Sequence, residues 1–269
     1  MKYFSLIFSL LIILLYSCKE DEVILNPELN STQASQDNLI AENIFNDVLR
    51  IVENGISNNK TQKQYPQYTL LNNDTSNIDT LLINFGSTNY LYNNKLRKGI
   101  INVTFSGNYR DSLSVITTTF DNFYINNKLI QGEMIVTNNG KNSNQNLWFN
   151  IDVNNASINT QNGVINWQSN RIREWISGAE TYLDLSDDIY RDTGSSNGNA
   201  ANGNTFSMQI IDPLHIDLSC LPSCVITSGN AEINPDGYPS RIVQYGDSTC
   251  DCNVDVIINN EKYPLVVEY

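Results

Sequence analysis

Two tryptophans and two arginines alternate with other residues in the segment VINWQSNRIREWI at 164–176. In an extended strand, Trp167, Arg171, Arg173 and Trp175 lie on one face, with Ser169 between them. Flat aromatic rings that alternate with guanidinium groups suit sugar rings, anionic glycans or a protein partner. The alternative is a structural ladder on the solvent side of a sheet, in which the arginines pair with acids on neighbouring strands. This Trp-Arg stripe is a candidate ligand face.

Four aspartates, Asp184, Asp187, Asp188 and Asp192, gather in the segment LDLSDDIYRD. Calcium sites are built from oxygen-rich loops, but the spacing matches no EF-hand pattern. We interpret the segment as a solvated acidic loop and leave calcium binding open. Two carboxylates about 5 to 9 Å apart could also hydrolyse a glycosidic bond, and Glu174 with Asp188 is one such pair. Because the chain has 29 acids, this pairing carries little information.

The single histidine, His215, lies between Leu214 and Ile216, and the chain has no GxSxG motif. A Ser-His-Asp triad and a multi-histidine metal site are therefore not expected. We interpret His215 as a partly exposed loop residue. The sequence predicts neither catalysis nor a cofactor.

Cys220, Cys224, Cys250 and Cys252 lie near the end of the chain. Outside the reducing cytoplasm they should form two disulfides rather than a four-thiolate zinc site. A bridge between Cys250 and Cys252 would be at or beyond unstrained reach. If NPDG at 234–237 turns the chain back antiparallel, residues whose numbers sum to about 473 lie opposite each other. This register predicts the bridges Cys224–Cys250 and Cys220–Cys252.

A thirteen-residue apolar run, interrupted by two serines, precedes Cys18. It suits the core of a signal peptide and is too short for a permanent membrane span. The tetrad LYSC at 15–18 resembles the bacterial lipobox, which implies cleavage before Cys18 and acylation of its thiol. Residues 1–17 are therefore a predicted lipoprotein signal peptide, and the lipid would hold the protein on a membrane. The alternative is an ordinary signal peptide in which Cys18 is incidental or becomes a disulfide partner.

The residues Lys19, Glu20, Asp21 and Glu22 follow the predicted lipidation site. They resemble the surface-export signal of Bacteroidota lipoproteins, and the alternative is a solvated acidic tether. The formal net charge of −13 repels phosphate backbones, so we do not expect nucleic acid as a partner. The predicted partners are the membrane, through the anchor, and a glycan or envelope protein.

The elements that position these residues follow from periodicity. Residues 18–34 lack it and read as a lipidated flexible tether. Apolar residues at three- and four-residue spacing predict one amphipathic helix at 35–55, with Ser35 as N-cap and Gly55 as a stop. Residues 56–269 read as an antiparallel β domain, with Asn-Asn turns at 126–127 and 259–260. The low-complexity stretch 193–205 is interpreted as a hairpin tip rather than a domain linker.

Several blocks of sequence are similar to those of an uncharacterised Bacteroidota surface lipoprotein family. They include INFG at 83–86, KGIINVTFSGNYRDSLSVITTTFDNFYIN at 98–126, RIREWISG at 171–178, DDIYRDTG at 187–194 and YGDSTCD at 245–251. The resemblance extends from about residue 33 to the C-terminus. It implies an exported all-β lipoprotein and assigns no activity.

The predicted fold is all-β: a large antiparallel meander of about 11–12 strands, forming an open sheet or half-barrel, with one N-terminal amphipathic helix. The predicted function is a binding or structural role in the outer membrane or at the cell surface, without a recognisable catalytic site. One alternative is an enzyme acting on surface glycans. The other is a periplasm-facing carrier like the half-barrel lipoprotein carriers of the LolA and LolB family, which an apolar cavity between helix and sheet would favour.

Overall fold

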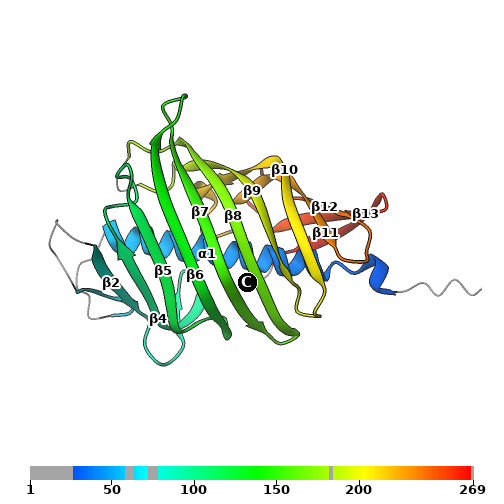
Figure 1. Cartoon of the computed structure of the whole chain (residues 1–269), viewed down its shortest axis with the longest axis horizontal. Coiled ribbons are helices and arrows are strands. Elements are labelled where there is room, and N and C mark those ends of the chain that lie inside the picture. Colours follow the sequence, from blue (N-terminus) through cyan, green and yellow to red (C-terminus); the bar gives the residue numbers. More distant parts are fainter. Residues whose placement is uncertain (1–26, 58–63, 72–77, 182–183, 268–269) are drawn as a thin grey trace, which may run out of the picture.

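The computed structural model describes residues 27–57, 64–71, 78–181 and 184–267. One α-helix, α1 (Gln33–Ser57), follows a short 3₁₀ turn (Pro27–Asn30), and the described strands form one antiparallel sheet (Figure 1). A second 3₁₀ turn, η2 (Leu218–Cys220), lies between β10 and β11. The strands are β1 (Gln67–Leu70), β2 (Asp79–Asn84), β3 (Tyr90–Tyr92), β4 (Lys95–Phe105), β5 (Val115–Ile125), β6 (Lys128–Lys141), β7 (Leu147–Thr160), β8 (Gly163–Ser177), β9 (Ile189–Asn199), β10 (Thr205–Asp217), β11 (Ile226–Pro235), β12 (Arg241–Gln244), β13 (Asn253–Ile258) and β14 (Glu261–Val266).

The strands follow one another in chain order across the sheet, apart from β3, which pairs with β4 beside the main path. Among the described residues β1 and β14 are the two edges and do not pair with each other, so the 14-stranded sheet stays open. The prediction of an all-β antiparallel meander with one helix is confirmed, with more strands than the expected 11 or 12. The stretch 193–205 is a hairpin between β9 and β10.

Paired asparagines make the tight turns of this meander. Asn126 and Asn127 have φ of 47° and 62°, and Asn259 and Asn260 have φ of 50° and 68°. Two successive residues with positive φ match the right-handed twist of antiparallel strands, and asparagine tolerates this conformation better than most residues. Both predicted two-residue turns are therefore confirmed.

Irregularities in the ladders bend the sheet. The β4–β5 register shifts between Lys98 and Ile100. Gly99, with φ of +91°, sits at that shift, where a Cβ atom would lie 2.0 Å from the carbonyl oxygen of Asn122. Similar shifts interrupt the β5–β6, β6–β7, β7–β8 and β9–β10 ladders. Because bulges bend a strand and increase its twist, a sheet with so many of them can curl around α1.

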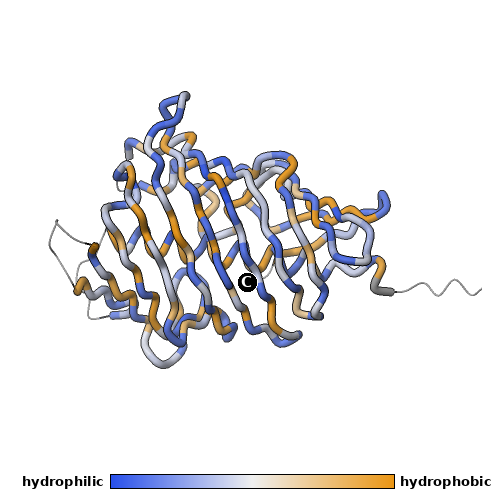
Figure 2. Tube along the Cα trace, viewed as in Figure 1, coloured by the Kyte–Doolittle hydropathy of each residue, from blue (hydrophilic) through white to orange (hydrophobic). Residues whose placement is uncertain are grey.

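The curved sheet wraps the helix. α1 passes behind the strands from β5 to β9 (Figure 1) and contacts β2, β8 and β11. Hydrophobic and hydrophilic residues alternate along the strands (Figure 2), and the apolar ones on the concave face pack around Ile44, Val48 and Val52, which are fully buried. The helix is therefore enclosed on several sides, and its polar residues Asn38, Glu42 and Asp47 are buried as well.

The helix is longer than predicted at both ends. It begins at Gln33, so Ser35 lies inside it, fully buried, and does not cap it. Gly55 also lies inside the helix. A Cβ atom there would come within 2.9 Å of Ile83 Cδ1 on β2, so the glycine allows close packing of the helix on the sheet and does not stop the helix. The predicted signal peptide, Cys18 and the residues Lys19, Glu20, Asp21 and Glu22 lie outside the described residues.

Candidate functional site

The Trp-Arg stripe lies on one face of β8, as predicted, but that face is the buried one. Trp167 and Trp175 are 4% and 1% exposed, and Arg171 and Arg173 are each 6% exposed. The expectation that the stripe faces solvent is therefore wrong. The structural alternative is right that an arginine of the stripe pairs with an acid on a neighbouring strand, because Arg173 binds Asp192 on β9. Alternation shows which residues share a face of a strand, and only the position of α1 decides which face is covered.

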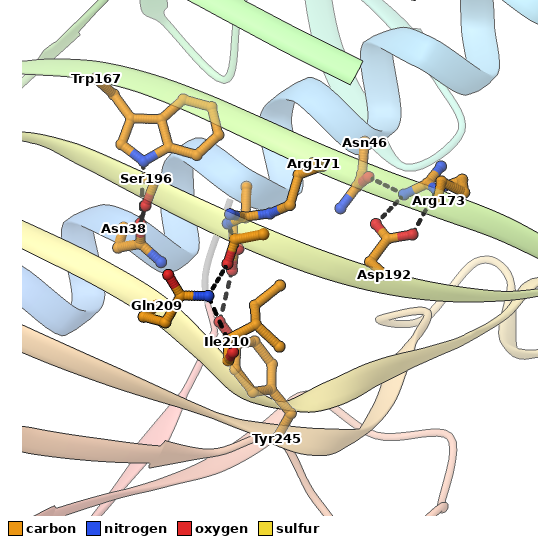
Figure 3. Close-up of polar contacts among 12 residues, drawn as sticks. Asn38, Asn46, Trp167, Arg171, Arg173, Asp192, Ser196, Gln209, Ile210 and Tyr245 are labelled. Atoms are coloured by element: carbon orange, nitrogen blue, oxygen red, sulfur yellow. Dashed lines mark hydrogen bonds and ion pairs between the residues drawn. The ribbon is translucent and has the colours of Figure 1, made fainter. Parts of the chain in front are cut away.

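Polar residues of the helix bind the stripe (Figure 3). Trp167 Nε1 donates to Asn38 Oδ1 at 3.0 Å, and Arg171 pairs with Glu42. Arg173 donates to Asn46 Oδ1 at 2.7 Å. These three helix residues recur every four positions on one face of α1. The matching polar spacing in the helix was a signal that the stripe faces the helix.

The acidic residues of 184–192 separate in the structure. Asp192 binds Arg173 through two bonds of 2.8 and 2.7 Å, and Asp188 accepts a bond of 3.2 Å from Trp175 Nε1. Asp184 and Asp187 are exposed and bind Ser186 and Thr181. Within the described ranges no group of three His, Cys, Asp or Glu residues is arranged to hold a metal ion.

Glu174 and Asp188 do not converge. Glu174 is next to Trp175 on β8, so its side chain leaves the opposite face of the strand. There it accepts hydrogen bonds from Asn142, Asn144 and Asn146 and pairs with Arg191. The bonds from Asn146 and Asn142 lower the pKa of Glu174 to about 2. Asp188 is fully buried on the concave side.

His215 is half-buried. It lies in β10 and not in a loop as predicted, and its Nδ1 lies 3.1 Å from Thr227 Oγ1.

The disulfides join Cys220 to Cys250 and Cys224 to Cys252, with Cα atoms 5.0 and 5.1 Å apart. Oxidation of all four cysteines agrees with the sequence prediction, whereas the predicted pairing is wrong. The β11–β12 ladder does follow the predicted turn, with Asn230 opposite Gln244.

The ladder ends at that pair, and the chain reverses at residues 245–252 to enter β13, which pairs back onto β12. Cys250 and Cys252 therefore lie in a loop and not on the extended β12 strand. Because of this reversal, Cys250 bonds Cys220 and Cys252 bonds Cys224, which is the opposite of the predicted pairing. As a result, both bridges hold residues 218–225, here called the cysteine loop.

A cavity of about 290 Å³, here called the α1 cavity, lies between the helix and the cysteine loop. One wall is polar and comes from one face of α1, with Asn46, Asp47, Arg50 and Glu53. The opposite wall is apolar and comes from the cysteine loop, with Leu218, Leu221, Pro222 and Val225. Pockets that combine an apolar wall with a few polar groups are typical of small-molecule sites.

One end of the α1 cavity is cationic. Asp47 accepts a bond of 2.9 Å from Arg50, lies 3.2 Å from Lys95 Nζ and also pairs with Arg97. Burial lowers the pKa of Lys95 to about 8, although Asp47 acts in the opposite direction. Three cations therefore surround one carboxylate at this end.

The other end contains Glu53, which is 7% exposed and lines the cavity. No donor among the described residues bonds its carboxyl, whose oxygens reach the open space of the cavity. Burial, reinforced by repulsion from Asp188, raises the pKa of Glu53 to about 7, while Arg110 and Arg173 act in the opposite direction. Burying a carboxylate without a donor is costly. Arg173, which also lines the cavity, offsets only part of that cost, so this end of the cavity favours a ligand that brings a hydrogen-bond donor with positive charge.

Sequence reasoning missed this cavity, because an amphipathic reading of α1 assigns Asp47, Arg50 and Glu53 to a solvated face. Their spacing of three residues shows that they share a face, but not that a loop 170 residues later covers it. Two other spaces lie beside α1. One is a groove of about 800 Å³ at the N-terminal half of the helix. The other, between α1 and the Trp-Arg stripe, is about 30 Å³.

Comparison of the chain with family models, curated proteins and solved structures finds no match. None of the described residues forms a helix long and apolar enough to cross a membrane.

Proposed function

We propose that this protein is a lipid-anchored protein of the outer membrane or cell surface with a binding role, and that the α1 cavity is its binding site. The binding role rests on one observation: a small cavity lined by the buried Glu53 side chain, whose carboxyl no donor among the described residues bonds. Two disulfides on the covering loop reduce the conformational freedom that a ligand would otherwise have to restrict.

Location rests on the N-terminal sequence. The apolar run, the LYSC tetrad and the residues Lys19, Glu20, Asp21 and Glu22 support export, acylation of Cys18 and surface exposure. The resemblance to a Bacteroidota surface lipoprotein family supports the same location. The two disulfides suit an oxidising compartment outside the cytoplasm.

The two alternatives have less support. A glycan-acting enzyme would need two carboxylates that converge beside the Trp-Arg stripe. Glu174 and Asp188 do not converge, because they lie on opposite sides of β8. A lipid or lipoprotein carrier would need an apolar cavity between helix and sheet, but the space between α1 and the Trp-Arg stripe, about 30 Å³, holds no more than a water molecule. The packed stripe thus supports neither alternative.

Fractionation tests the anchor. Cys18→Ala should move the protein out of the membrane fraction and abolish labelling by a fatty-acid probe. Added protease should degrade the wild-type protein on intact cells, and alanine at Lys19, Glu20, Asp21 and Glu22 should protect it. Labelling of the Cys18→Ala variant would rule out acylation at this residue, and protection of the wild-type protein would place it in the periplasm.

Native mass spectrometry tests the binding role without presuming a ligand. The oxidised mature protein is incubated with a small-molecule cell extract, and the masses that it retains are recorded. Ser223→Trp, which fills the α1 cavity, should abolish retention, whereas Ser87→Trp at an exposed position should not. Melting temperatures of both variants confirm folding. Equal retention by the two variants would exclude the α1 cavity as the binding site.

A further inference from the structure

The charged residues of the α1 cavity lie in sequence along one helix face. Arg50 and Glu53 are separated by three residues, and Asp47 and Glu53 by six. At 1.5 Å rise per residue, these spacings correspond to about 4.5 Å and about 9 Å along the axis. The cavity therefore has two basic side chains toward one end, here called the cationic end, and the Glu53 carboxyl toward the other, here called the anionic end, where Arg173 also lines the cavity. Both ends lie within the length of a small molecule.

We propose that the α1 cavity binds a short peptide of two or three residues with free termini: its ammonium group at Glu53, its carboxylate at Arg50 and Lys95, and an apolar side chain against the cysteine loop. This inference rests on the proposed binding role and names its ligand. Each part of such a ligand meets one feature of the cavity.

The cationic end suits a carboxylate. The side chains of Arg50 and Lys95 are 20% and 13% exposed, whereas Arg97, the third cation around Asp47, is completely buried. Arg50 and Lys95 both line the cavity, so they are the two that a ligand can reach. Guanidinium groups bind carboxylates through two parallel hydrogen bonds, so Arg50 can hold the carboxylate of a ligand.

The anionic end suits an ammonium group. Glu53 is 7% exposed, and no donor among the described residues bonds its carboxyl. An ammonium group has three donors and no acceptor, so it can satisfy this carboxylate and compensate for its burial. Burial raises the pKa of Glu53 to about 7, which agrees with a carboxylate that lacks a compensating donor.

The apolar wall suits a hydrophobic side chain. Leu218, Leu221, Pro222 and Val225 face the helix across the cavity, and burying an aliphatic side chain there removes apolar surface from water. The disulfides Cys220–Cys250 and Cys224–Cys252 hold this wall in place.

The dimensions of the α1 cavity limit the length of the ligand. A residue spans at most about 3.3–3.6 Å, so the termini of an extended dipeptide are roughly 7 Å apart, between the two helix spacings. A single amino acid carries both charges on one carbon atom and cannot reach both ends. The volume of about 290 Å³ is at the lower limit for small-molecule pockets, which suits two or three residues.

Isothermal titration calorimetry on the oxidised mature protein tests the proposal with three probes: Leu-Leu, N-acetyl-Leu-Leu and Leu-Leu-amide. We expect binding of Leu-Leu and at least tenfold weaker binding of each blocked peptide. These comparisons use the wild-type protein and do not depend on the folding of any variant.

Two substitutions then assign the ends. Glu53→Gln should weaken Leu-Leu at least tenfold and leave the affinity for N-acetyl-Leu-Leu nearly unchanged. Arg50→Gln should weaken Leu-Leu in the same way and leave the affinity for Leu-Leu-amide nearly unchanged. Glu180→Gln, at an exposed position outside the cavity, should change none of these values.

Equal affinity for free and blocked peptides, or no binding of Leu-Leu at millimolar concentration, would overturn the proposal. The binding role would survive that result if the wild-type protein still retained another small molecule that Ser223→Trp loses. If the protein neither binds Leu-Leu nor retains any small molecule that Ser223→Trp loses, both the peptide proposal and the binding role fail.

Discussion

Glu42 and Arg171 form an ion pair in the interior of the protein, with side chains 4% and 7% exposed, and so join α1 to β8. The second oxygen of the same carboxylate accepts a hydrogen bond of 2.6 Å from the hydroxyl of Tyr245, which follows β12. Burial and the neighbouring Glu42 carboxylate raise the pKa of Tyr245 well above its ordinary value, so the phenol stays protonated and donates. One helix residue therefore connects two distant parts of the sheet.

Removing that carboxylate should destabilise the fold strongly. Glu42→Ala leaves the Arg171 guanidinium buried without its counter-charge, and breaking such a pair costs about 3–5 kcal/mol of unfolding free energy. Urea denaturation measures the loss. The control is Asp255→Asn, which breaks the pair between Asp255 and Lys262, 33% and 59% exposed, and should cost less than about 1 kcal/mol. Similar losses for both variants would contradict the central role of Glu42.

The Trp-Arg stripe should act as part of the core. Trp175 packs against the rings of Tyr109, Phe149 and Tyr190, so Trp175→Ala should cost about 3–5 kcal/mol. Ile172 lies on the opposite face of β8 and is 44% exposed, and Ile172→Ala should cost less than about 1 kcal/mol. Chemical denaturation compares the two variants. A stable Trp175→Ala protein would show that this ring does not support the fold.

Stability should depend on pH through Glu53. Its pKa is raised from 4.5 to about 7, mainly by burial and then by Asp188. The folded state therefore binds a proton more tightly than the unfolded state, and the associated stability, present below pH 4.5, is lost as pH rises through 7. The charged and titratable groups that act on Glu53, or on which it acts, are Asp188, Arg110, Arg173, Tyr109 and Tyr190.

Glu53→Gln removes this titration. Between pH 4.5 and 8 the unfolding free energy of the wild-type protein should fall by about 2–3 kcal/mol more than that of the variant. Urea denaturation at several pH values measures both slopes. Part of the fall should remain in the variant, because burial also raises the pKa of Asp188 to about 7. Parallel slopes for wild type and variant would show that Glu53 titrates alike in both states.

The disulfide pattern is open to direct test. Non-reducing peptide mapping should recover Cys220 with Cys250 and Cys224 with Cys252. Replacing both cysteines of either bridge with serine should lower the unfolding free energy by about 2–4 kcal/mol. The two losses should be similar, because the bridges close loops of nearly equal length, with separations of 30 and 28 residues. Recovery of Cys224 with Cys250 would contradict the structure.

Much of the fold is local enough to be predicted from sequence. The Asn-Asn turns at 126–127 and 259–260 require positive φ at two successive positions, a property of the turn residues themselves. Alternation along β8 placed Trp167, Arg171, Arg173 and Trp175 on one face because the strand repeats every two residues. Helical spacing likewise predicted α1, with an error of two residues at each end.

Tertiary structure alone decided what those faces meet. The bends in the sheet place its concave side around α1, so the stripe became core and Asn38, Glu42 and Asn46 became its partners. The reversal after Gln244 set the disulfide pairing, and with it the loop that covers Asp47, Arg50 and Glu53. The sequence by itself determined turns, periods and the predicted lipobox, because these depend on neighbouring residues. Which residues are covered, paired or left around a cavity depends on contacts between segments far apart in the sequence. The separations are 127–129 residues between α1 and the stripe and 28–30 residues for the disulfides, and no local pattern specifies such contacts.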